Sequence, residues 1–101
     1  MALARMKHAG ADTLRRMDDL LGPLRELGVF REPRPGYFYL KGRAFMHFHE
    51  DASGLFADVR LSQREFSRFA VDTPEQRLQL LRTVQQTVSG RLQFLDGCHG
   101  V

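Results

Sequence analysis

Hydrophobic side chains recur at two different spacings along the chain. Between residues 12 and 27 they return every three or four positions, which is the period of one helix face. The members of this stripe are Leu14, Met17, Leu20, Leu21, Leu24 and Leu27. Asp12 is placed to cap this helix, and Gly28 to end it. Gly22-Pro23 lies inside the stripe, so the helix either kinks there or stops and restarts with Pro23 in a first turn.

From Tyr37 the spacing changes to two, and aromatic and branched residues become frequent. This pattern predicts three antiparallel strands. They cover residues 37–40, 43–49 and 55–61. Lys41-Gly42 and residues 51–54 supply the turns, so the strands form a meander. Residues 31–36 contain two prolines and are expected to form a loop.

The register of this meander decides which residues are buried. If Leu40 faces Arg43 and Glu50 faces Leu55, alternate residues gather on two faces. The face that makes the better core collects Tyr37, Tyr39, Ala44, Met46, Phe48, Leu55, Ala57 and Val59. The other collects Phe38, Leu40, Phe45, His47, His49, Phe56, Asp58 and Arg60. Aromatic residues on this second face need cover, either from the C-terminal helices or from a second copy of the chain in a symmetric dimer.

Two capping motifs predict two helices after the meander. Ser62 and Glu65 form a capping box, which predicts a short helix ending near Val71-Asp72. Thr73-Pro74-Glu75-Gln76 begins another helix, which keeps its period as far as Gly90. Residues 91–101 are compatible with helix, strand or tail. We therefore predict an α+β fold in which a three-stranded antiparallel meander packs with an N-terminal helix and two C-terminal helices.

Length and composition fit one domain over residues 1–101, with residues 1–11 as a flexible or irregular arm. The net charge of +3 permits anionic partners without requiring them. No apolar run approaches the roughly 20 residues that span a bilayer, so no membrane association is expected. A single cysteine cannot form an internal disulfide, which indicates the reducing cytoplasm.

His47 and His49 form the most distinctive chemical motif. Alternate residues of a strand share a face, so both imidazoles point to the same side. In the register above Asp58 lies across from His47, and these three residues are candidate ligands for a divalent metal ion. Cys98 or His99 would add a ligand if the tail folds back. The same group suits acid–base work, but the sequence offers no paired nucleophile, because Ser53 and Ser62 fall at a turn and a cap.

Arg60, Arg64 and Arg68 recur every four residues, and the last two share a face of the predicted short helix. These arginines are candidates for binding nucleic-acid phosphates. A solvated helix face in an arginine-rich chain explains the same spacing. Glu65 and Asp72 would partly neutralise the patch.

The run Lys41-Gly42-Arg43-Ala44-Phe45, with the acidic turn at residues 50–54 and a strand from Leu55, resembles the central hairpin of the MmcQ/YjbR-like domains and other small bacterial α+β domains. The order of elements is similar over residues 12–85. The resemblance implies a small α+β fold, DNA binding in some members, and no catalytic residues to carry over.

These observations favour a small bacterial domain without enzymatic activity that serves as an interaction or nucleic-acid-binding module. The alternative is a metal-binding or acid–base site built on His47, His49 and Asp58. The first hypothesis implies nucleic acid or a protein as partner and no cofactor, and the second implies a divalent metal ion.

Overall fold

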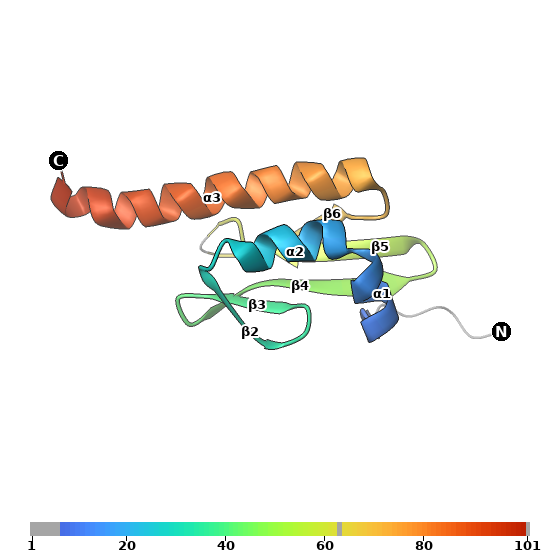
Figure 1. The fold of residues 1–101 in the computed structure, drawn as a ribbon. Coiled ribbons are helices and arrows are strands. Elements are labelled where there is room, and N and C mark those ends of the chain that lie inside the picture. Colours follow the sequence, from blue (N-terminus) through green and yellow to red (C-terminus); the bar gives the residue numbers. More distant parts are fainter. Residues whose placement is uncertain (1–6, 63, 101) are drawn as a thin grey trace.

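The computed structural model describes the backbone of residues 7–62 and 64–100, with side chains up to residue 90. Within that range the fold is α+β, with one six-stranded antiparallel sheet and three helices (Figure 1). The helices are α1 (Ala11–Arg16), α2 (Asp18–Glu26) and α3 (Pro74–Gly100). The strands are β1 (Lys7–His8), β2 (Phe30–Arg34), β3 (Tyr37–Leu40), β4 (Arg43–Asp51), β5 (Gly54–Val59) and β6 (Ser67–Ala70). The α+β class is confirmed, but three strands and one N-terminal helix were too few.

The predicted N-terminal helix is two helices, and the break is not at the proline. It falls at Met17, which leaves helical geometry and separates α1 from α2. Pro23 lies inside α2, where it removes one backbone donor. The helix continues through it because Leu20, Leu21 and Leu24, on both sides of the proline, are all buried in the core.

The strands follow the order β2-β3-β4-β5-β6, and β1 pairs with the later half of β4. The predicted pairs Leu40 with Arg43 and Glu50 with Leu55 are both present. The predicted loop over residues 31–36 is largely strand β2. Its register shifts between Arg31 and Arg34, and β2 is an edge strand, where prolines are tolerated. Within the arm predicted over residues 1–11, Lys7 and His8 form a strand and Ala11 begins α1, whereas residues 1–6 lie outside the described part of the chain.

A bulge between β3 and β4 changes the predicted faces. Phe38 pairs with Met46 whereas Tyr39 pairs with Ala44, so Phe45 is the additional residue on β4. The added residue reverses which alternate positions of β3 face the core. Phe38 and Phe45 are accordingly buried there, each with 1% of its surface exposed. The assignment of these two residues and Leu40 to the histidine face was therefore wrong. Tyr37, predicted for the core, lies beside the histidines instead.

The helix predicted to begin at Ser62 is not formed. Ser62 Oγ accepts hydrogen bonds from the amides of Arg64 and Glu65, as a capping residue does, but the chain then enters strand β6. Pairing of β6 with β5 satisfies the backbone of this segment, an interaction between residues distant in sequence that local spacing does not reveal.

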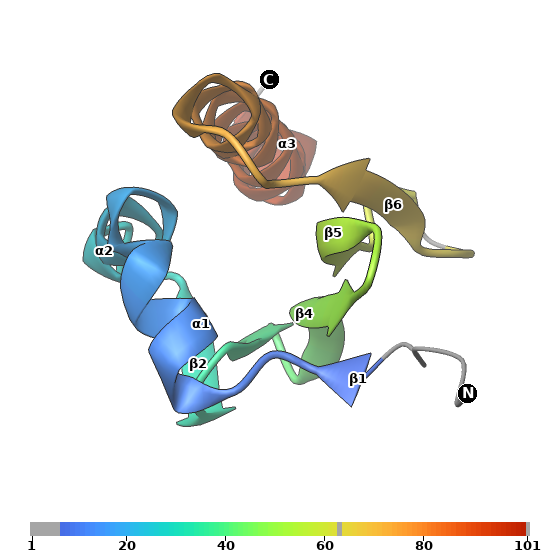
Figure 2. The same cartoon turned by 90° about the vertical axis from the view of Figure 1, so that its right-hand side faces the viewer.

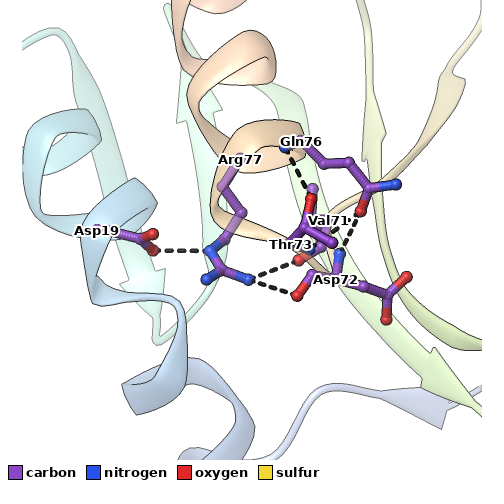
Figure 3. Close-up of polar contacts among 6 residues, drawn as sticks. All are labelled: Asp19, Val71, Asp72, Thr73, Gln76 and Arg77. Atoms are coloured by element: carbon purple, nitrogen blue, oxygen red, sulfur yellow. Dashed lines mark hydrogen bonds and ion pairs between the residues drawn. The ribbon is translucent and has the colours of Figure 1, made fainter.

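The start of α3 agrees with its prediction. Thr73 Oγ1 accepts from the amide of Gln76, and Gln76 Oε1 accepts from the amides of Asp72 and Thr73 (Figure 3). Arg77 donates to Asp19 on α2 and to the carbonyl oxygens of Val71 and Asp72, which ties the two helices to the end of β6. The helix passes Gly90 and continues to Gly100. Residues 91–100, whose sequence was compatible with helix, strand or tail, are therefore helical.

All three helices lie on one side of the curved sheet (Figure 2). They enclose the core with the sheet residues Phe38, Phe45, Met46, Phe48, Ala57 and Val59. His47 and His49 alternate with Met46 and Phe48 on β4, so they belong to the opposite face. The C-terminal helices were one of two alternatives for covering the histidine face, but α3 packs on the opposite face of the sheet.

Candidate metal centre

Three histidines meet on the sheet face that the helices do not cover. His47 and His49 come from β4, and His8 comes from β1, directly opposite His49 in the pairing. One ring nitrogen from each histidine lies within 4.8 Å of the others. The His8 and His49 rings stack with centroids 5.0 Å apart, and those of His47 and His49 are 4.7 Å apart. Nitrogens that bind one ion lie closer together than 4.8 Å, so metal binding would require a rotation of the exposed His8 side chain.

Hydrogen bonds from the N-terminal segment hold His8 in this position. The amide of Gly10 donates to Glu50 Oε2 at 3.0 Å, and Thr13 Oγ1 lies 3.1 Å from the same oxygen. The amide of Ala9 donates to the carbonyl of Phe48 at 3.1 Å. The bond from Gly10, followed by that from Thr13, holds the pKa of Glu50 below its usual value. Glu50 is thus an ionised anchor for the segment that carries His8.

Asp58 joins the cluster through its contacts with His49 and Arg68. It faces His47 in the register, as predicted, but its Oδ2 lies 3.1 Å from His49 Nε2. Arg68 Nε donates to Oδ1 at 2.8 Å and Nη2 donates to Oδ2 at 2.9 Å. This paired donation from Arg68 keeps the pKa of Asp58 low, although burial acts against it. The carboxylate is therefore charged, and both of its oxygens are engaged.

Two imidazole nitrogens of the cluster lack a protein partner. Nδ1 of His47 and Nδ1 of His49 are buried, and neither has a hydrogen-bond partner in the described part of the chain. Nε2 of His49 faces the acceptor Asp58, so Nδ1 is the ring nitrogen left for another partner. Burial lowers the pKa of His47, the neighbouring His49 lowers it further, and Asp58 opposes both. Neutral imidazoles with unused lone pairs are the form that binds metal ions.

Aromatic and cationic side chains surround the histidines. The Tyr37 ring lies 5.0 Å from that of His8 and 6.3 Å from that of His47, and Phe66 lies 5.2 Å from His47. A guanidinium stacks on the Tyr37 ring and another on the Phe66 ring. Cζ of Arg34 lies 4.7 Å from the Tyr37 centroid, and Cζ of Arg60 lies 4.4 Å from the Phe66 centroid. No local pattern predicted this arrangement, because it depends on the bulge in β4 and on the pairing of β6 with β5.

The three candidate phosphate-binding arginines do not share a helix face. Arg68 lies on β6 and binds Asp58. Arg60 donates to the carbonyl of Ala44 and stacks on Phe66. Arg64 is exposed in the turn that precedes β6. Nucleic-acid binding by this trio stays a prediction, and the helix on which it was based is absent.

The structure brings together all three predicted metal-site residues and adds His8, which sequence reasoning missed. A strand of two residues is too short to show a period, so no local signal marked His8 as part of the sheet. Cys98 and His99 lie in the last turn of α3, whose end extends away from the sheet (Figure 1). Ser53 and Ser62 serve turns, Ser53 through hydrogen bonds to Asp51 and Ser62 through the amides after it.

Comparison with known proteins gives no relative for this chain: no protein-family model, curated protein or solved structure matches it. The resemblance to MmcQ/YjbR-like domains therefore stays a prediction. Among the residues that the structure describes, no helix combines the length and the apolar character needed to cross a membrane.

Proposed function

We propose that this chain is a metal-binding domain that holds one divalent transition metal ion, with zinc as the expected ion, between His8, His47 and His49. The observation that carries the proposal is the pair of buried, unpartnered Nδ1 atoms of His47 and His49 beside a third histidine. A buried polar atom without a partner costs free energy, and an ion bound to both nitrogens removes that cost.

The ligand type favours zinc and its neighbours over calcium or magnesium. Imidazole nitrogen suits zinc, copper, iron and nickel, whereas calcium and magnesium prefer oxygen ligands. Three histidines also form a common zinc ligand set. The lowered pKa of His47 favours its neutral form, so protons compete only weakly with a metal ion for its ring nitrogen near neutral pH.

Asp58 acts in this proposal as a support for His49 and not as a ligand. Ligating histidines usually donate their second N–H to a carboxylate, which fixes the ring and raises its basicity. The contact between His49 Nε2 and Asp58 has this form, and Arg68 fixes the carboxylate in turn. The earlier hypothesis that Asp58 coordinates the metal directly is replaced by this outer role.

Thermal unfolding of the full chain, in EDTA and then in excess zinc, tests the proposal. An ion at a hundred times its dissociation constant should stabilise the fold by about 2.7 kcal/mol. For a chain of this length the midpoint should rise on the order of 10 °C or more.

Two variants and one control make the result specific. The double change His47→Ala and His49→Ala should abolish the rise, and His8→Ala should reduce it. His99→Ala is the matched control, because it removes a histidine at the far end of α3 and should leave the rise intact. An unchanged midpoint with zinc, or a rise that survives the double change, would contradict the proposal.

A further inference from the structure

The histidine cluster provides three ligands, one fewer than a tetrahedral zinc ion takes. Structural zinc sites have four protein ligands, whereas sites with three keep a position for an outside ligand. Among the described histidine, cysteine and acidic side chains, the group has three members. Asp58 is the nearest carboxylate in the register, and its oxygens are already bound by Arg68 and His49.

The Tyr37 hydroxyl is a further buried polar group at this site. Its oxygen is buried and has no hydrogen-bond partner within the described residues. The ring that carries it contacts the rings of both His8 and His47. A phenolic hydroxyl donates well to an anionic oxygen, and such a bond would satisfy this group.

The charges around the cluster favour an anion. Arg34 and Arg60 stack on Tyr37 and Phe66, the two aromatic residues that contact the histidines. The negative charge of Asp58 is offset by the paired hydrogen bonds from Arg68. The bound metal would add two positive charges of its own.

From these contacts we propose that the metal centre binds a small oxyanion, the carboxylate or phosphate group of a ligand. One of its oxygens completes the coordination of the metal and accepts a hydrogen bond from the Tyr37 hydroxyl. This inference rests on the proposed function, since the oxyanion binds through the metal. It assigns to Tyr37 the role of a specificity-determining residue that contacts the ligand.

Cobalt in place of zinc makes the coordination visible in the absorption spectrum of the full chain. The cobalt-loaded protein is titrated with acetate in one arm and with inorganic phosphate in the other. A saturable spectral change is expected in at least one arm. A response to acetate alone identifies a carboxylate ligand, a response to phosphate alone identifies a phosphate ligand, and a response to both supports oxyanion binding in general.

The variant Tyr37→Phe should raise the dissociation constant of the responding anion about tenfold, the effect of one hydrogen bond to a charged oxygen. Cobalt affinity should be unchanged. Tyr39→Phe is the matched control on the same strand and should behave as the unaltered chain. If cobalt binds but neither anion alters the spectrum, or if Tyr37→Phe has no effect, the inference is overturned and the metal site stands. If cobalt does not bind, the proposed function itself fails and this inference fails with it.

Discussion

Asp58 contacts His49 and not the histidine that faces it across the sheet. The backbone pairs Asp58 with His47, yet the 3.1 Å contact runs from Oδ2 to Nε2 of His49, one step along the same face. Arg68 lies opposite Asp58 on the other side, in β6, and holds both carboxylate oxygens. Three neighbouring strands thus contribute one residue each to an arginine–carboxylate–histidine chain that ends at the proposed ion.

Asp58 is predicted to strengthen zinc binding through this arginine–carboxylate–histidine series. Asp58→Asn keeps the shape of the side chain but removes the charge that Arg68 and His49 contact. Zinc affinity, measured by calorimetric titration, should fall about 10- to 100-fold, as it does when such supporting carboxylates are lost elsewhere. Asp12→Asn makes the same chemical change at an exposed residue that pairs with Arg15, and its affinity should match the unaltered chain. Equal affinities for the two variants would remove Asp58 from the site.

Glu50 is predicted to affect metal binding without touching the metal. Its carboxylate holds Gly10 and Thr13, so Glu50→Ala should release the segment that carries His8. Zinc affinity should fall about tenfold through loss of a charge-assisted hydrogen bond. The Gly10 amide should also exchange its hydrogen faster. Glu26→Ala, at the exposed end of α2, is the control; slow exchange at Gly10 in Glu50→Ala would show that other contacts hold the segment.

The acid sensitivity of the fold should depend in part on Glu32, which lies away from the histidines. Burial alone would raise its pKa, but hydrogen bonds from Arg25 and from the Gly36 amide outweigh burial and lower it. A carboxylate with a lowered folded pKa stabilises the fold above its unfolded pKa of about 4.3, and this contribution disappears as pH falls through the folded value.

Urea unfolding of Glu32→Gln and of the unaltered chain measures whether the stabilisation by Glu32 is lost as pH falls. The variant should be less stable by roughly 1 kcal/mol at pH 6, a modest value because Arg25 is partly exposed. The difference should shrink steadily from pH 5 to pH 3. A difference that is constant with pH, or that grows in acid, would contradict the assigned role.

Gly54 is predicted to be far less replaceable than Gly42, although both have positive φ. A Cβ at position 54 would lie 2.6 Å from Asp72 Oδ1, the oxygen that accepts from the amide of Leu55. Nothing lies within 4 Å of a Cβ at position 42. In urea unfolding, Gly42→Ala should cost about 1 kcal/mol from backbone strain, and Gly54→Ala about 2–4 kcal/mol because it also displaces Asp72. Equal costs would show that Asp72 moves away freely.

Local sequence signals predicted the parts of the fold that depend on local interactions. The β4–β5 pairing follows from a period of two around a short turn, and it placed Asp58 opposite His47 correctly. The start of α3 follows from a capping box whose hydrogen bonds are all present. The histidine spacing on β4 then predicted two of the three proposed ligands.

Interactions between distant segments determined the rest. The bulge at Phe45 exchanges the faces of β3, because burying Phe38 and Phe45 together outweighs strict alternation. The segment over residues 62–70, which ends in β6, has a capping motif and phenylalanines three residues apart, which are typical of a helix. The edge of β5 instead pairs with all four residues of β6. His8 joins the site only because β1 pairs with β4, which two residues of sequence cannot indicate.

X-ray absorption at the zinc edge of the zinc-loaded full chain measures whether three histidines bind one ion. We expect nitrogen and oxygen neighbours at about 2.0–2.1 Å and the outer-shell scattering of three imidazoles. That imidazole scattering should weaken in His8→Ala. A sulfur neighbour at about 2.3 Å, or a first shell without imidazole, would contradict the claim.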